Sequence, residues 1–189
     1  MKKFTILGSL VLICLLNSCV NSSVLTARGN TTFLPDDNKY VGADIQFGTE
    51  IIAYPKGHLD GMVQLGYGKA NLSNEELIEV KSIRQGFTAG AGFAYFFSNE
   101  RFQPFIGLEM GGLFASNKKD NEIQKTEKNT KDTYVFFTPN AGFRFYLTNM
   151  FAVTGTIGYQ HQTIKINKND YSMGGITPSL GIVYVIRKR

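Results

Sequence analysis

The sequence contains no tryptophan, two cysteines and two histidines, and charged residues make up 19% of its 189 positions. Both cysteines, Cys14 and Cys19, lie near the N-terminus, so the chain beyond them cannot form an internal disulfide. Two isolated histidines without a cysteine pair provide no metal-ligand spacing, and the glycine-rich stretches lack the helix that a phosphate or cofactor loop requires. The sequence therefore predicts no metal and no cofactor. The absence of a basic stripe along any one element also argues against a nucleic-acid partner.

No stretch of the chain reaches the roughly 18 apolar residues that a membrane helix needs. Residues 1–19 instead are typical of a secretory signal peptide, because two lysines precede a short apolar run. This segment ends in "LNSC", which resembles the lipobox of bacterial lipoproteins and makes Cys19 a candidate for lipidation. Ordinary cleavage after Ser18 or near Ala27 is the alternative. If the mature chain lies in a membrane, strands must place it there.

From residue 40 onward, apolar residues recur at every second position, which is the period of a β-strand. Seven segments show this pattern: "YVGADIQFGTEIIAY", "LDGMVQLGYGKA", "GFTAGAGFAYFF", "PFIGLEMGGLF", "YVFFTPNAGFRFYL", "FAVTGTIGYQHQT" and the closing "GGITPSLGIVYVIRKR". Pro139 and Pro178 fall on the apolar parity of their segments. Because proline removes a donor from the ladder, we expect a bulge or a strand end at each.

The connections between these segments alternate in length. Short ones fall near residues 55–58, 98–101 and 148–150, and long polar ones at residues 71–81, 116–132 and 167–171. Outer-membrane barrels show this alternation, with short turns on the periplasmic side and long loops outside. Since such barrels have an even number of strands, an eighth strand must precede residue 40, and Val24–Leu34 is the candidate. The predicted fold is all-β: an eight-stranded antiparallel up-and-down transmembrane beta-barrel over residues 24–186, with a basic periplasmic tail at residues 187–189.

A soluble lipocalin-like barrel would show the same period, so the residue types must decide between the two. The polar parity holds mainly Gly, Thr, Ser, Gln and Asn, rather than the Lys, Glu and Asp that suit water. The apolar parity is nearly free of charge, and aromatics such as Tyr54, Phe102 and Phe151 gather near strand ends, as in an interfacial girdle. These features favour the cell outer membrane, with its lipids and lipopolysaccharide as partners. A soluble periplasmic barrel is the alternative.

The strand pattern, the loop alternation and the amphipathic closing strand resemble the small eight-stranded outer-membrane proteins of the OmpA/OmpX type, a porin-like outer membrane beta-barrel domain. The resemblance covers residues 24–186 and implies the barrel assembly machinery as a partner. Family members usually end on an aromatic residue, whereas here "RKR" follows Tyr184 and Ile186. We expect a non-catalytic role in envelope integrity or in surface interaction through the long outer loops.

The polar parity carries charges that would face the lumen, namely Arg28, Asp44, Glu50, Asp60, Arg84, Glu109 and Arg144. An eight-stranded interior is filled by side chains, and buried ions are stable when they are paired and hydrogen-bonded. We therefore expect a structural polar core. A sharper hypothesis is a narrow pore gated by Glu109, which would exchange between arginine partners.

An enzymatic alternative depends on His161 in "YQHQT", on the lipid-facing parity near the outer end of its strand. It resembles the outer-membrane lipid A deacylases, which carry a His-x-Ser pair and a glutamate. Here Thr163 replaces the serine, and the closing segment carries no carboxylate. We therefore expect no catalytic activity and assign His161 to the headgroup level and His58 to a periplasmic turn. Host or surface ligands would bind through the outer loops, which carry both acids and lysines: Glu75, Glu76, Glu79, Lys118, Lys119, Lys125 and Lys128.

Overall fold

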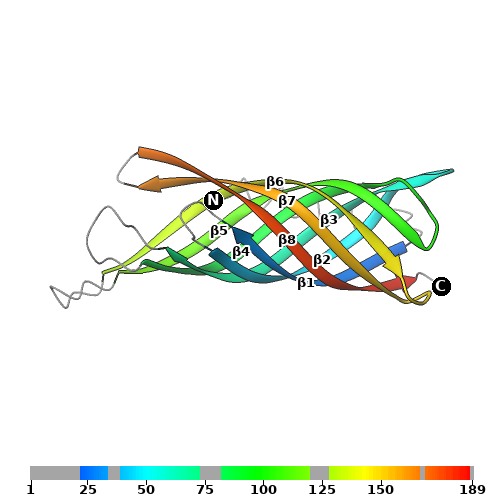
Figure 1. Cartoon of the computed structure of the whole chain (residues 1–189), viewed down its shortest axis with the longest axis horizontal. Helices are drawn as coiled ribbons and strands as arrows, with labels where there is room; N and C mark the ends of the chain where they lie inside the picture. Colours follow the sequence, from blue (N-terminus) through cyan, green and yellow to red (C-terminus); the bar gives the residue numbers. More distant parts are fainter. Residues whose placement is uncertain (1–21, 34–38, 73–81, 120–127, 167–168, 188–189) are drawn as a thin grey trace, which may run out of the picture.

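A computed structural model describes residues 22–33, 39–72, 82–119, 128–166 and 169–187, and the structural statements below concern these residues. Eight antiparallel strands form one closed barrel in which β1 also pairs with β8 (Figure 1). The strands are β1 Ser22–Phe33, β2 Lys39–Tyr54, β3 Gly57–Leu72, β4 Ser82–Phe96, β5 Phe102–Lys119, β6 Lys128–Tyr146, β7 Phe151–Ile166 and β8 Asn169–Arg187. The predicted fold is confirmed, including the first strand that closure requires. None of the described residues forms a helix that is long and apolar enough to cross a membrane.

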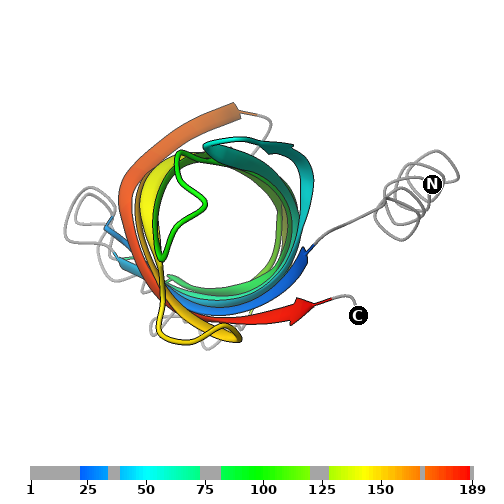
Figure 2. The ribbon, with the colours of Figure 1, turned by 90° about the vertical axis from the view of Figure 1, so that its right-hand side faces the viewer.

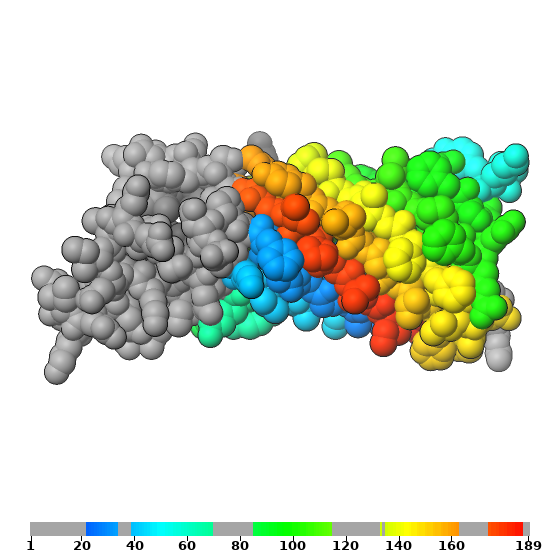
Figure 3. Space-filling model, viewed as in Figure 1, coloured from blue at the N-terminus to red at the C-terminus, as the bar shows by residue number. Residues whose placement is uncertain are grey.

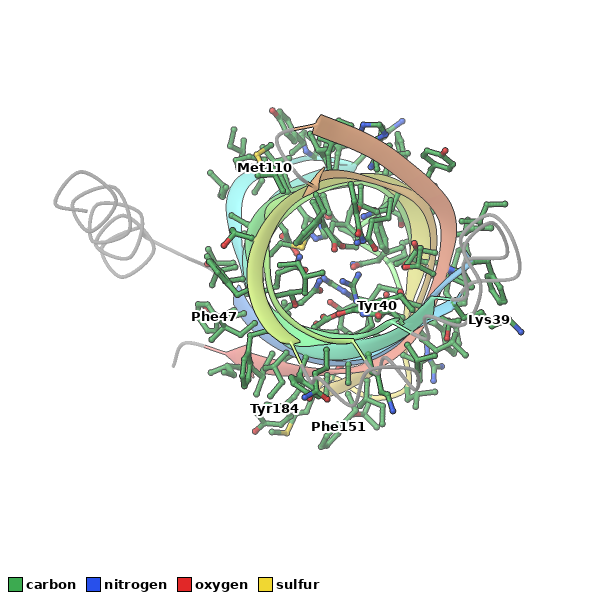
Figure 4. All side chains as sticks on the ribbon, turned by 90° about the vertical axis from the view of Figure 1, so that its left-hand side faces the viewer. Lys39, Tyr40, Phe47, Met110, Phe151 and Tyr184 are labelled. Atoms are coloured by element: carbon green, nitrogen blue, oxygen red, sulfur yellow. The ribbon has the colours of Figure 1, made fainter. Side chains whose placement is uncertain are left out.

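The barrel wall separates an apolar outer surface from a polar interior, because successive residues of a strand point to opposite sides. In β8, Leu180 and Ile182 are 74% and 63% exposed, whereas Ser179 of the same strand, on the opposite face, is buried. Viewed along the barrel, Phe47 and Tyr184 point outward and Tyr40 points into the lumen (Figure 4). Large apolar side chains facing outward and polar ones inward are the arrangement of a barrel surrounded by lipid.

The seam between the first and last strands is continuous with the rest of the wall. β1 and β8 run side by side as the diagonal blue and red bands of the space-filling view (Figure 3). Their register joins Ser22 to Arg187 at one end and Phe33 to Ile176 at the other. The weakly patterned β1 is therefore fixed by pairing on both sides, with β2 and β8.

The two ends of the barrel differ. At what we call the turn end, the strands are joined by residues 55–56, 97–101 and 147–150. At the opposite loop end, they are joined by residues 34–38, 73–81, 120–127 and 167–168. Two of the predicted long loops, at residues 116–132 and 167–171, are shorter than expected. The ladder of β5 and β6 continues to Lys119 and Lys128, and that of β7 and β8 to Ile166 and Asn169. Polar composition did not end these strands, because a ladder satisfies its backbone groups whatever the side chains.

The prolines do not interrupt the barrel as predicted. Pro139 and Pro178 lie inside continuous strands and pair with β5 and β7 respectively. On the other side of each proline, the described β6–β7 ladder lacks pairs at residues 138–139 and the β1–β8 ladder lacks them at residues 177–178, with the register unchanged. The lack of an N–H at each proline therefore removes ladder pairs with only one of its two neighbouring strands. A register shift occurs instead in β2, between Glu50 and Ile52.

Candidate functional site

The lumen is the candidate site, because the barrel buries most of the charged residues that the sequence assigns to it. Five residues that the sequence assigns to the lumen expose at most 9% of their surface: Arg28, Asp44, Asp60, Glu109 and Arg144. Glu50 is half-buried at the turn end, where the Ser22 hydroxyl donates a hydrogen bond of 3.5 Å to its Oε2. Arg84 belongs to β4, but its side chain lies outside the described part of the chain.

Arg28 is the centre of a buried cluster formed by β1, β2, β5 and β6. Its two terminal nitrogens donate to the two carboxylate oxygens of Glu109 at 2.7 and 2.8 Å, and its Nε donates to both oxygens of Asp44 at 3.2 Å. Asn140 donates to Glu109 at 3.1 Å and Asn30 to Asp44 at 2.8 Å. We call these five residues the central cluster. A bidentate guanidinium–carboxylate pair supplied with further donors is the arrangement that makes buried ions stable.

A second group, which we call the turn-end cluster, lies nearer the turns. Both terminal nitrogens of Arg144 donate to Asp60 Oδ2 at 3.3 Å, and the guanidinium lies 4.2 Å from the ring centre of Phe96. His58 stacks on the same ring, with 4.6 Å between the His58 and Phe96 ring centres. Its Nε2 is 3.6 Å from Asp60 Oδ1, and its Nδ1 is 2.8 Å from Asn99 Oδ1.

The assignment of His58 to a periplasmic turn is wrong. His58 is the second residue of β3 and is buried. The Asn99 amide donates to the carbonyl oxygen of Tyr54 at 3.1 Å, which turns its own oxygen toward His58. Nδ1 of His58 therefore carries the hydrogen, since Asn99 Oδ1 can only accept. The shared parity of His58 and Asp60 is the sequence signal that could have placed this histidine in the lumen.

The connection at residues 97–101 narrows the turn end, where it crosses part of the barrel opening (Figure 2). Arg101 holds it in place, donating from Nε to the carbonyl of Tyr146 at 2.6 Å and from a terminal nitrogen to that of Leu147 at 3.0 Å. A cavity of about 600 Å³ opens here and is lined by His58, Arg144 and other polar groups. The mouth is thus wider than the interior behind it.

Behind the mouth, the lumen divides into small cavities. One of about 30 Å³ lies between the clusters and is lined by Arg28, Glu109 and Arg144. Another of about 50 Å³ borders the central cluster on the side of Tyr40. A water molecule needs roughly 10–15 Å³ of such space, so each cavity has room for a few waters. The described lumen is therefore a packed polar core with small voids.

Glycines in the wall make room for the bulky side chains of this core. A Cβ on Gly111 would stand 2.8 Å from the ring of Phe136, and one on Gly68 would overlap the phenol of Tyr40. Phe136 and Tyr40 are both buried, at 5% and 8% exposure. Bulky rings therefore close the lumen at places where a larger wall residue would clash.

Several predicted site residues lie away from the lumen or beyond the described residues. His161 is exposed in β7 and pairs with Phe137 of β6 and Gly174 of β8. Thr163 follows in the same strand, but its side chain is not among those described. Cys19 and the signal segment lie outside the described residues. The same is true of residues 188–189 and of the side chains that the sequence assigns to the outer loops, namely Glu75, Glu76, Glu79, Lys118, Lys119, Lys125 and Lys128.

Comparisons with known proteins match this architecture. The family model described as "Outer membrane protein beta-barrel domain" matches residues 61–186. A comparison with curated protein sequences finds no match. Among solved structures, Neisserial surface protein A has a TM-score of 0.57 at 14% identity, covering 86% of this chain and 95% of its own. The N-terminal barrel of Pseudomonas aeruginosa OprF has a TM-score of 0.52 at 15% identity, covering 88% and 98%. The outer membrane enzyme PagL has a TM-score of 0.54 at 14% identity, covering 86% and 99%.

Proposed function

Because this chain belongs to the family of outer membrane protein beta-barrel domains, we propose that it is a non-catalytic barrel that serves envelope integrity or surface interaction through its loop end. The observation that carries this proposal is the packed lumen. The ion pairs of Arg28 with Glu109 and of Arg144 with Asp60 lie in series along the barrel, with cavities of about 30 and 50 Å³ beside them. A core of this kind supports a rigid scaffold better than it supports transport.

The orientation follows from the two ends of the barrel. Short turns of bacterial barrels face the periplasm, and longer connections face outward. The turn end joins strands through two to five residues, whereas the loop end contains the longer connections at residues 73–81 and 120–127. We therefore place the loop end at the cell surface, where surface ligands meet it. The C-terminal end of β8 then lies on the periplasmic side.

A complementation experiment tests the proposed role. A strain lacking the protein receives either the wild type or a variant in which residues 120–127 are replaced by a Gly-Ser linker of equal length. Restored detergent resistance with both proteins supports a role in envelope integrity. Restored binding to surface ligands with the wild type alone supports surface interaction. If neither protein restores either property, the proposal is wrong.

The non-catalytic part of the proposal is tested separately. The likeness to PagL concerns the fold. In the resemblance of His161 and Thr163 to the His-x-Ser pair of lipid A deacylases, a threonine takes the place of the serine. We expect the acylation of lipid A to be the same in cells with and without this protein. Loss of an acyl chain in cells with the wild type, and its retention with His161→Ala, would establish the hydrolase instead.

A gated narrow pore is the second candidate, and one observation favours it. Glu109 pairs with Arg28, yet Arg144 lines the same cavity of about 30 Å³. A second arginine is therefore available across the void if Glu109 changes its rotamer. Single-channel recordings of Glu109→Ala test this candidate, because a gate predicts altered conductance. Recordings identical to those of the wild type would remove it.

A further inference from the structure

A groove of about 700 Å³ crosses the outer surface of β1–β4 in the half of the barrel near the loop end. Small outward-facing residues open it: Ala27, Gly29, Ala43 and Ala89. A Cβ added to Gly29 would meet no atom within 4 Å, so the space there is empty of protein. The hollow is lined mainly by apolar groups.

The strand register explains the shape of this groove. Gly29 lies opposite Ala43, Ala43 opposite Tyr67, and Tyr67 opposite Phe87, so these four residues form one row across four strands. The small residues Gly29 and Ala43 thus lie beside two aromatic rings. Tyr67 and Phe87 contact each other edge to face, with 5.2 Å between their ring centres, and are 47% and 67% exposed. The outer surface is therefore raised by the rings of Phe87 and Tyr67 and falls almost to the level of the backbone at Gly29.

Two lysines stand above the groove on its loop-end side. Lys69 follows Tyr67 by two residues on the same face, which places it about 7 Å further along the strand. Lys39 lies on the outer side of β2 (Figure 4), and its Nζ is 5.8 Å from the ring centre of Phe33. Both side chains are exposed, so their ammonium groups can reach an anionic group at the membrane surface.

We propose that this groove binds an acyl chain of a phosphorylated, acylated glycolipid of the outer leaflet, of the lipopolysaccharide type, with its phosphate held by Lys39 and Lys69. Any apolar stretch of the wall would accept a hydrocarbon chain. The two lysines at one end of the groove make the site selective, because they favour a lipid whose anionic headgroup lies on the loop-end side. The site deepens the proposed surface role and relies on the orientation proposed above.

The test compares lipopolysaccharide retained by the full chain in detergent, measured by native mass spectrometry. Gly29→Phe places a ring in the groove, at a position where an added Cβ meets no atom within 4 Å, and Ala141→Phe adds the same ring at an exposed position of β6 on the opposite half of the wall. Lys39→Gln with Lys69→Gln removes the cations, and Lys56→Gln removes an exposed lysine at the turn end. Dephosphorylated lipopolysaccharide serves as the second probe.

We expect Gly29→Phe to weaken binding roughly tenfold, because the ring takes the place of the acyl chain. The loss of each lysine should weaken binding about fivefold, and dephosphorylated lipopolysaccharide should bind the wild type as weakly as the double variant binds the intact lipid. The two controls should match the wild type. Equal losses with Gly29→Phe and Ala141→Phe, or indifference to the phosphate, would overturn the proposal.

The orientation has its own measurement, so that the two failures can be told apart. A membrane-impermeant maleimide should label Lys69→Cys on whole cells if the loop end faces outward. If labelling fails while the detergent binding follows the pattern above, the orientation is wrong and with it the assignment to the outer leaflet, although the groove and its two lysines still bind the lipid. If labelling succeeds while binding does not discriminate the variants, the site is wrong and the orientation stands.

Discussion

Replacing Glu109 by glutamine should destabilise the folded barrel more than a comparable change at its mouth. Glu109 accepts hydrogen bonds of 2.7 and 2.8 Å from Arg28, which keeps Asp44 at 3.2 Å as a second partner. Breaking a buried ion pair typically costs about 3–5 kcal/mol, because the remaining charge stays buried. Asp44 and the new amide oxygen compensate in part, so we expect a loss of about 2–3 kcal/mol in the free energy of unfolding.

Urea titration of the refolded chain in micelles measures this loss, with folded and unfolded forms separated on a gel without heating. Glu50→Gln is the matched control, since Glu50 is half-buried and its contact with Ser22 is long, at 3.5 Å. We expect the control to change the free energy of unfolding by no more than about 0.5 kcal/mol. Equal losses for the two variants would refute the assignment of the central cluster as the stabilising core of the lumen.

Three further changes probe other parts of the barrel by the same urea titration. Arg144→Met leaves the buried Asp60 without its cation and should cost about 3 kcal/mol, and an unchanged midpoint would contradict the turn-end cluster. Gly175→Ala would push a Cβ against the backbone oxygen of Phe33 at the seam and should lower the midpoint. Gly29→Ala enters open space and should leave the midpoint unchanged or raise it. Similar effects of the two alanines would contradict the described seam.

The sequence was sufficient for the facing of most residues, since a strand has a period of two and small polar residues alternate with large apolar ones. Arg28 and Glu109 could be assigned to the lumen in this way. Their pairing could not be predicted, because 81 positions separate them and β1 and β5 lie on different parts of the wall. Which charges meet depends on strand tilt and side-chain length, and neither is visible in the alternation.

The ends of strands were harder to predict than their faces. The β2–β3 connection consists of residues 55–56, so β3 begins early enough to bury His58. The polar residues around Lys119 and Lys128 suggested a loop, yet they continue the ladder of β5 and β6. The residue types at a strand end indicate whether water or lipid surrounds it. The ladder itself depends on the backbone alone. The aromatic Phe96 was missed because two outward-facing aromatic neighbours, Tyr95 and Phe97, concealed its parity.

The central claim is that the ion pairs of the lumen close this outer-membrane barrel. Conductance of the purified wild-type chain in a planar lipid bilayer tests it most directly. We expect no discrete current steps, because Nη1 of Arg28 lies 2.7 Å from Oε1 of Glu109 across the lumen, and the cavity beside this pair holds only about 30 Å³. Stable, long-lived current steps from the wild-type protein would show an open water path and would contradict the account.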